Sequence, residues 1–172
     1  MTSRCAKPIL ALLLVLALGL GFAARTIAAP AAGLNWEVHG TGSGSVTVST
    51  GGSSSGPAMP QHVGNATYLV TLSNPQIFST NGRGVGVGAG LCSIATGMGG
   101  IEAADGSTIS FATVGTLCNE GDVNSAVHYN GTYRITVGTG RFLGVLGGGS
   151  LTATFDGGSP HFIKIDGTIT GL

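Results

Sequence analysis

Charged side chains are scarce in this sequence: Asp, Glu, Lys and Arg together make up 8% of its 172 residues. Proteins that bind nucleic acids neutralise phosphates with clustered Lys and Arg, and the sequence has no such cluster. Nucleic acid is therefore excluded as a partner. The low charge does not indicate disorder, because 42% of the residues are hydrophobic, which is more than an unfolded chain carries.

Motifs for catalysis or for binding a cofactor are also missing. Glycines alternate with other residues over 82–90, but the helix that follows a nucleotide-binding loop is not evident. There is no Gly-x-Ser-x-Gly nucleophile elbow. The histidines lie too far apart in sequence for typical zinc-ligand spacing: His39, His62, His128 and His161. Glu37 and His39, which would share one strand face, are the one pair that could ligate a metal or share a proton. We expect no cofactor and no metal, and the catalytic residues, if any, stay unknown.

The first 31 residues have the three parts of a secretory signal peptide: a basic start, an apolar run over 9–20 and a stretch of small residues. Residues 29–31, Ala-Pro-Ala, match a cleavage site, and a cut near Ala29 is the alternative. A helix that spans a bilayer needs about 20 apolar residues. Because this run is shorter, we expect a cleaved leader and no stable membrane span afterwards, with an uncleaved anchor as the other reading. The predicted location is secreted or periplasmic.

Residues 32–172 are predicted to form a single domain. They contain four basic and seven acidic residues, which gives a net charge of −3 with no cluster of either sign. An oxidising compartment favours a disulfide between the two cysteines of this domain, Cys92 and Cys118. Closing a loop of about 26 residues contributes roughly 3.5 kcal/mol in the chain-entropy model. Two free thiols are the alternative that the sequence leaves open.

Apolar and polar side chains alternate with a period of two along the domain, whereas no helical period is sustained. The apolar faces of these segments are Leu34, Trp36 and Val38; Val46 and Val48; Tyr68, Val70 and Leu72; Ile109 and Phe111; Tyr133, Ile135 and Val137; Leu151, Ala153 and Phe155; Ile163 and Ile165. This pattern is typical of antiparallel strands with one wet face. We predict an all-β domain of eight to ten short strands, closed into a barrel, with a β-sandwich as the fallback.

Asn or Asp followed by glycine marks the predicted turns. Asn130-Gly131 separates two alternating runs and predicts the two-residue turn of a hairpin. Asp105-Gly106 and Asp156-Gly157-Gly158 predict further turns, and Asp166-Gly167 predicts a bulge or bend. The stretch 51–62, rich in Gly, Ser and Pro, is predicted to be a long flexible loop within the domain.

The most distinctive local pattern follows a strand that contains Tyr133 and reads Gly-Thr-Gly-Arg-Phe-x-Gly-x-x-Gly. Gly138 and Gly140 permit a sharp reversal, and Phe142 is placed to plug the barrel end. The pattern consists of residues with an architectural role: Gly138, Thr139, Gly140, Arg141, Phe142, Gly144 and Gly147. Over 131–155 the chain resembles the allene oxide cyclase and dirigent family of eight-stranded barrels, and it looks like small exported bacterial members of that group.

The resemblance implies an antiparallel β-barrel of about eight strands, preceded here by the signal-peptide helix. Plant members of the family cyclise an epoxide or steer radical coupling inside the barrel, using polar residues on other strands. No position of this sequence is matched to those residues, so the resemblance assigns no catalytic residue, and the fold alone does not determine the function.

Three functions are compatible with an exported small barrel. We favour a non-catalytic protein that binds a small apolar ligand or acts through its surface. One alternative is a cofactor-independent enzyme, an isomerase or cyclase, that acts inside the barrel. The other is an envelope structural or adhesive protein, which would form a homo-oligomer through a strand edge.

The state of the barrel interior separates these functions. A continuous cavity with inward-pointing polar groups favours the enzyme. The candidate ligand-binding residues of such a cavity are Tyr133, Arg134 and His161. A cavity lined only by aliphatic side chains favours carriage of an apolar ligand. A filled barrel with an apolar patch on its outside favours assembly.

Overall fold

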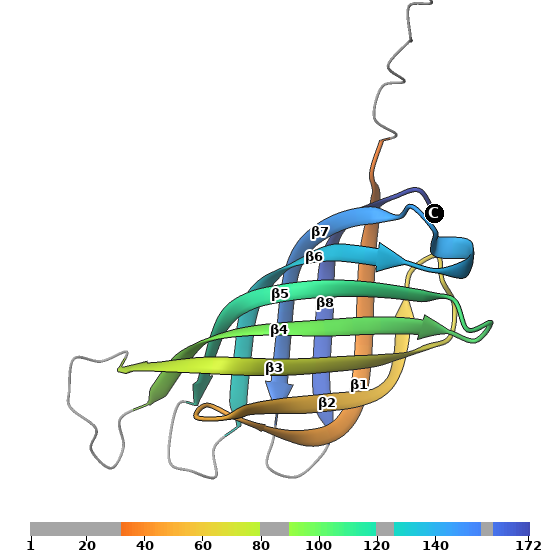
Figure 1. Cartoon of the computed structure of the whole chain (residues 1–172). Coiled ribbons are helices and arrows are strands. Elements are labelled where there is room, and N and C mark those ends of the chain that lie inside the picture. The colour runs from red at the N-terminus through yellow and green to blue at the C-terminus, as the bar shows by residue number, and fades with distance from the viewer. Residues whose placement is uncertain (1–31, 80–89, 120–125, 156–159) are drawn as a thin grey trace, which may run out of the picture.

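The computed structural model describes residues 32–79, 90–119, 126–155 and 160–172, which form a closed barrel of eight antiparallel strands in chain order (Figure 1). The elements are β1 (Leu34–Thr47), β2 (Gly51–Pro60), β3 (Ala66–Ser79), β4 (Leu91–Ala103), β5 (Thr108–Asn119), β6 (Val127–Gly138), the 3-10 helix η1 (Gly140–Phe142), β7 (Leu146–Phe155) and β8 (His161–Thr170). The predicted all-β barrel is thus confirmed. The predicted leader over 1–31 lies outside the described residues.

The barrel closes where the first strand pairs with the last. Leu34 of β1 lies opposite Ile169 of β8, and the pairing continues without interruption to Gly42 and His161. Each strand therefore has two neighbours, which removes the exposed edges that would template aggregation. The sandwich fallback is wrong for this reason. In Figure 1, β3, β4 and β5 run side by side in front of β1 and β8.

Alternation along the strands sends one face into a single core, as predicted for most segments. The buried apolar side chains include Trp36, Val38, Tyr68, Val70, Leu72, Ile109, Phe111, Leu151, Phe155, Ile163 and Ile165. Val137 departs from the prediction and is 55% exposed. The pairing of β5 with β6 shifts between Ser110 and Phe111, so β6 carries one extra residue and the alternation changes face after Ile135.

Inward-facing glycines make room for aromatic rings that lie across neighbouring strands. A Cβ atom at Gly40 would lie 2.7 Å from the Tyr68 ring, and one at Gly131 would lie 2.6 Å from the Tyr129 hydroxyl oxygen. Carbon atoms do not approach that closely without displacement, so these positions accept only glycine while the rings stay in place. The rings occupy interior space that a ligand would need.

Two predicted interruptions of the strands are wrong. The stretch 51–62 is not a flexible loop, because residues 51–60 form β2, which pairs with both β1 and β3. Asn130-Gly131 is not a hairpin turn, because both residues lie in the middle of β6 and pair across to β5 and β7. In both places glycine accommodates close approach of a neighbouring strand or ring, and the strand continues. The strands are consequently longer than predicted, at 10 to 14 residues.

The predicted turn at Asp105-Gly106 is confirmed, since these residues connect β4 to β5 and Gly106 has a φ of 78°. The predicted bulge at Asp166-Gly167 is wrong, because both residues pair in register with Glu37 and Trp36. The predicted turn over 156–158 and the glycines over 82–89 lie outside the described residues. In the part of the chain that the structure describes, no helix is long and apolar enough to cross a bilayer.

Candidate functional site

Two of the three candidate ligand-binding residues face into the barrel. His161, at the start of β8, is 1% exposed, and its Nδ1 lies 3.0 Å from Ser54 Oγ on β2. Ser54 in turn lies 2.8 Å from the Tyr68 hydroxyl oxygen, and all three side chains are buried. The His161 ring also meets Phe155 edge-on, with 5.3 Å between ring centroids. This is a polar contact chain packed inside the core.

Tyr133 also faces inward, and its hydroxyl group has no hydrogen-bond partner among the described residues. Its ring packs against Trp36 and Phe111, with centroid distances of 6.2 Å and 5.7 Å. Burial, with a smaller contribution from the Asp166 carboxylate, raises the pKa of Tyr133 to about 12. The phenol is therefore neutral at ordinary pH and is a poor proton donor for catalysis.

The three candidates do not converge on one site. Arg134 points to the outside of β6, where its neighbours across the sheet are Ala112 and Gly148. Tyr133 lies level with Gly167, six residues along β8 from His161. At roughly 3.4 Å per residue, that separation is about 20 Å along the strand. The inward polar groups therefore belong to different ends of the core.

The Gly-Thr-Gly-Arg-Phe segment connects three turns at one end of the barrel. Arg141 donates from Nη2 to the Val63 carbonyl oxygen at 2.9 Å, and its Nε lies 3.3 Å from Asp105 Oδ2. Its guanidinium carbon lies 4.8 Å from the centroid of the Phe142 ring, which is itself buried. Gly140 has a φ of 58°, a value that favours glycine. The contacts agree with an architectural role for this segment.

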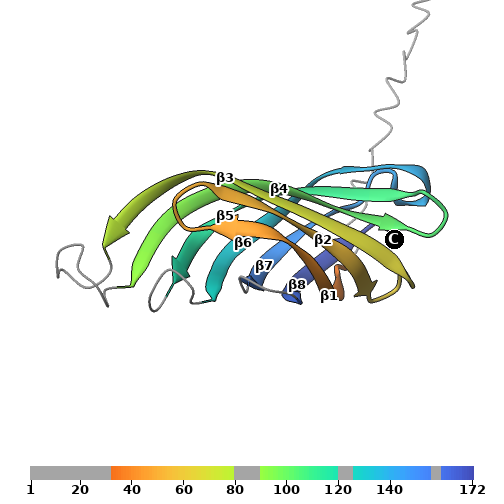
Figure 2. The same cartoon turned by 90° about the horizontal axis from the view of Figure 1, so that it is seen from below.

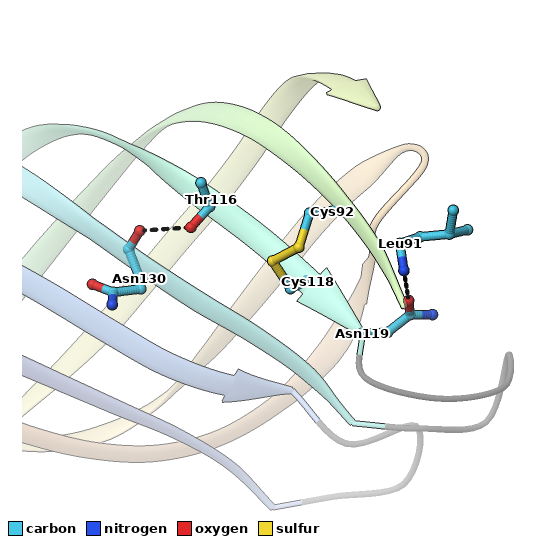
Figure 3. The surroundings of a disulfide bond; sticks show 6 residues. All are labelled: Leu91, Cys92, Thr116, Cys118, Asn119 and Asn130. Carbon is cyan, nitrogen blue, oxygen red and sulfur yellow. Dashed lines mark hydrogen bonds between the residues drawn. A yellow bond between two sulfur atoms is a disulfide. The ribbon is translucent and has the colours of Figure 1, made fainter. Parts of the chain in front are cut away.

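The predicted disulfide joins Cys92 of β4 to Cys118 of β5, which face each other directly across the two strands (Figure 3). Beside it, the Leu91 backbone N–H donates to Asn119 Oδ1 at 2.9 Å. The pair alternates with the inward residue Leu117, so it lies on the outer face of the sheet. The bridge fixes the ends of β4 and β5 opposite the turn that connects these strands.

Charged side chains gather on the outer face of β1 and β8. Lys164 Nζ donates to Glu37 Oε1 at 3.0 Å and to Asp166 Oδ2 at 2.9 Å. His39 Nε2 lies 2.9 Å from the same Glu37 oxygen, so the predicted pair does share one face. The hydrogen bond from Lys164 lowers the pKa of the Glu37 carboxyl below its ordinary value. These groups are exposed and satisfy one another.

The opposite outer face, over β3, β4 and β5, carries a groove of about 720 Å³, whose lining also includes Ser55 and Gly56 of β2. That volume lies in the range of small-molecule sites. Leu69 and Met98 line the groove and are 52% and 70% exposed. Glu102 is the one charged residue in the lining, and the other polar lining side chains are hydroxyls, among them Thr67 and Ser110. The groove therefore offers an apolar floor with hydrogen-bonding walls.

Gly100 forms the middle of the groove floor, and the fold does not require glycine there. A Cβ atom at Gly100 would have one neighbour within 4 Å, the Ile109 carbonyl oxygen at 3.5 Å, an ordinary contact. Its φ is not in the left-handed region. The preceding residue is different, because a Cβ atom at Gly99 would overlap the Phe111 ring. The open floor at Gly100 thus needs an explanation other than packing.

Sequence reasoning did not find Leu69, Met98, Gly100 and Glu102. A signal was present in the run Tyr68-Leu69-Val70, where apolar residues occupy both faces of one strand. A strand in a filled barrel needs only its inner face apolar, so an apolar residue on the outer face marks a candidate contact surface. The sequence did not indicate a role for Gly100, because it does not distinguish a strand glycine that faces an aromatic ring from one that faces solvent.

Comparison with protein-family models, with curated proteins and with solved structures gives no match for this chain. Within the described residues, no group of three or more His, Cys, Asp and Glu side chains is arranged to hold a metal ion. We take the outer groove of about 720 Å³ as the candidate site, and a hollow of about 530 Å³ that includes His39, His128 and Lys164 in its lining is another that the geometry offers.

Proposed function

We propose that this protein is an exported, non-catalytic β-barrel that binds a small apolar ligand on its outer surface, in the groove over β3, β4 and β5. Export is supported by the pattern of residues 1–31 and by the disulfide, which forms in oxidising compartments. The eight-stranded barrel is compatible with the resemblance to the allene oxide cyclase and dirigent family, and membership of that family is part of the proposal.

The observation that carries the proposal is the contrast between the buried aromatic rings on the inside of the described barrel and the open groove on its outside. Trp36, Phe111 and Tyr129 are each 1% exposed and occupy the core across from glycines or other rings. On the outside, the floor at Gly100 is bare although a side chain would fit. An apolar molecule bound there would cover Leu69 and Met98. Removing these apolar side chains from water would favour binding through the hydrophobic effect.

The enzyme alternative has less support. Tyr133 and His161 do face inward, but they lie at different levels of a packed core. Catalysis in the barrel needs polar groups that converge on a space for the substrate. The side chains of Tyr68, Ser54 and His161, which contact one another in series, are instead buried, each no more than 2% exposed.

Assembly is the second candidate, because the groove belongs to a wider apolar area. The exposed apolar side chains on this face are Leu69, Ile94, Met98 and Val114. Such an area also favours contact between two copies of the chain. Light scattering across a hundredfold range of protein concentration separates the two: a constant monomer mass supports ligand binding, and a concentration-dependent dimer supports assembly.

A pair of leucines gives a matched test of the ligand site. Leu69 on β3 and Leu34 on β1 have similar exposure, 52% and 48%, but only Leu69 lines the groove. We expect Leu69→Ser to weaken binding of the neutral apolar dye Nile red by roughly fivefold to tenfold, the effect of removing a few buried methylene groups. Leu34→Ser should leave the dissociation constant unchanged. Equal effects of the two substitutions would contradict the proposal.

A further inference from the structure

We infer that the ligand of the groove is an amphipathic organic cation, whose apolar body covers Met98 and Gly100 and whose charged head lies at Glu102. This inference rests on the proposed function, and it adds the chemical class of the ligand. The evidence is the order of side chains along β4, the charge of Glu102 and the shape of the surface beyond it.

The outer face of β4 changes from apolar to acidic along its length. Met98, Gly100 and Glu102 point outward in turn, about 7 Å apart at two residues per step. Across the sheet, Met98 has Thr71 and Ala112 as neighbours, and Gly100 has Leu69 and Ser110. A ligand that lies along β4 therefore meets a methionine, then bare backbone beside a leucine, and then a carboxylate, over about 14 Å.

Glu102, the acidic residue of this row on β4, has polar neighbours on both adjacent strands. Glu102 has Thr67 of β3 and Thr108 of β5 as its cross-strand neighbours. Hydroxyl and carboxylate oxygens accept hydrogen bonds from an ammonium group. Neither threonine brings a positive charge that would neutralise the carboxylate.

Glu102 differs from the other acidic residues of the described chain in having no ion pair there. Glu37 and Asp166 both contact Lys164, and Asp105 contacts Arg141. Arg134, on the outside of β6, is not part of the groove lining. The carboxylate of Glu102 is therefore available for a cation brought by a ligand, whereas an anionic ligand would meet only like charge in the groove.

A second hollow adjoins the acidic end and gives the head group room. It measures about 440 Å³ and is lined by Asn65, Thr67, Glu102 and residues of the turn between β4 and β5. Glu102 and Thr67 line both hollows, so they stand where the two meet. A substituted ammonium group fits this place better than a compact one does, since the surface stays open beyond the carboxylate.

Three eight-carbon probes test the inference: n-octylammonium, 1-octanol and octanoate, whose head groups are positively charged, neutral and negatively charged. Their dissociation constants are measured on the purified protein from the shift of the Met98 methyl resonance. We expect n-octylammonium to bind about threefold to fivefold more tightly than 1-octanol, and octanoate to bind more weakly than both, as for an exposed charge pair. Added salt should reduce the difference.

Two variants that change net charge equally separate the groove carboxylate from the charge of the whole protein. Glu102→Gln should make n-octylammonium and 1-octanol bind equally while 1-octanol binding is kept. Asp166→Asn, on the outer face of β8, should keep the preference for the cation. Gly100→Val, which fills the floor, should weaken all three probes at least tenfold without loss of folding, as judged by circular dichroism.

The outcomes distinguish the two proposals. If 1-octanol shifts Met98 and n-octylammonium binds no more tightly, the inference about the cation is wrong and the proposed function stands. If Asp166→Asn abolishes the preference as fully as Glu102→Gln does, the cation inference is also wrong. If no probe shifts the Met98 resonance, both the inference and the proposed function are wrong.

Discussion

Two tyrosines inside the barrel differ in whether their hydroxyl groups have partners. Tyr129 Oη lies 2.8 Å from Thr113 Oγ1, and Thr113 donates onward to the Thr132 carbonyl oxygen. Tyr133 has no such partner among the described residues. Since a buried hydroxyl without a hydrogen bond loses the stabilisation it had from water, the same chemical change should have opposite effects at the two positions.

We therefore expect Tyr133→Phe to raise the free energy of unfolding by about 1 kcal/mol, because it removes an unpaired buried hydroxyl. Tyr129→Phe is the control and should lower it by about 1 kcal/mol, because it leaves Thr113 without that partner. Urea denaturation followed by circular dichroism measures both. A loss of stability in Tyr133→Phe equal to that in Tyr129→Phe would show that the Tyr133 hydroxyl is in fact hydrogen-bonded.

The same tyrosine predicts how stability depends on alkaline pH. Burial raises the pKa of Tyr133 to about 12 in the folded protein, whereas the ordinary value of 10.0 applies when the chain unfolds. Below pH 10 both states hold the proton and stability is complete. Between pH 10 and 12 only the unfolded state ionises, so the free energy of unfolding falls by about 3 kcal/mol in total from this group.

Urea denaturation at pH 8 to 12 measures this loss. Burial raises the pKa of Tyr68 and Tyr129 as well, so the wild type should lose stability over the same interval through all three of its tyrosines. Tyr133→Phe should make the decline less steep. A variant whose stability declines as steeply as the wild type would contradict the assignment to Tyr133.

Neighbouring glycines on β4 provide a further test at single residues. Gly99→Ala places a methyl group against the Phe111 ring, and overpacking of this kind costs about 1–3 kcal/mol. Gly100→Ala meets only an ordinary contact and should leave stability unchanged or raise it by up to about 1 kcal/mol. Thermal denaturation of the two variants measures the difference, and equal destabilisation would refute the outward placement of Gly100.

At the scale of strands and turns, the sequence pattern succeeded where side chains alternate and failed where glycine interrupts them. The alternation around Trp36, Val70 and Ile165 predicted buried faces that the structure has. At 51–60 and at Asn130-Gly131, composition typical of loops forms strand instead. Glycine weakens a strand in isolation, but here an aromatic ring or the backbone of another strand packs closely against the glycine. This contact joins residues that are distant in sequence, so the local sequence pattern does not predict it.

The candidate site shows the same limit of prediction. The sequence offers Tyr133, Arg134 and His161 as polar residues that could point into a cavity of the barrel, and two of the three do face inward. Their separation follows from strand register, which alternation alone does not give. The groove is lined by residues of four neighbouring strands, β2 to β5, so its lining could be identified only after the pairing of these strands was known.

The disulfide gives a prediction for the hairpin of β4 and β5. It closes 26 residues of chain, and replacing both cysteines by serine should lower the free energy of unfolding by about 3 kcal/mol. Denaturation of the double variant measures the loss, with the reduced wild type as the control. A loss below about 1 kcal/mol would show that the hairpin pairing already restricts the unfolded chain.

At the scale of the whole molecule, the barrel has two outer faces of different character around one packed core. The face over β1 and β8 carries an exposed network of charges together with the exposed ring of Phe162. The face over β3 to β5 carries the groove and the exposed side chains of Leu69, Ile94, Met98 and Val114. Figure 2 shows the long strands β3 and β4 arching together along one side of the barrel. On the basis of this division we propose that a ligand binds on the outside, while the buried side chains of the inside serve stability.

The most direct test of this division uses two residues in one NMR titration. Trp36 is the one tryptophan of the sequence and lies in the core, and Met98 lies on the groove, so the indole N–H and the methionine methyl report on the inside and the outside. On titration with 1-octanol we predict that the Met98 resonance shifts with saturation while the Trp36 indole resonance stays in place. A saturating shift of the Trp36 indole with Met98 unchanged would place the ligand inside the barrel and contradict the proposed function.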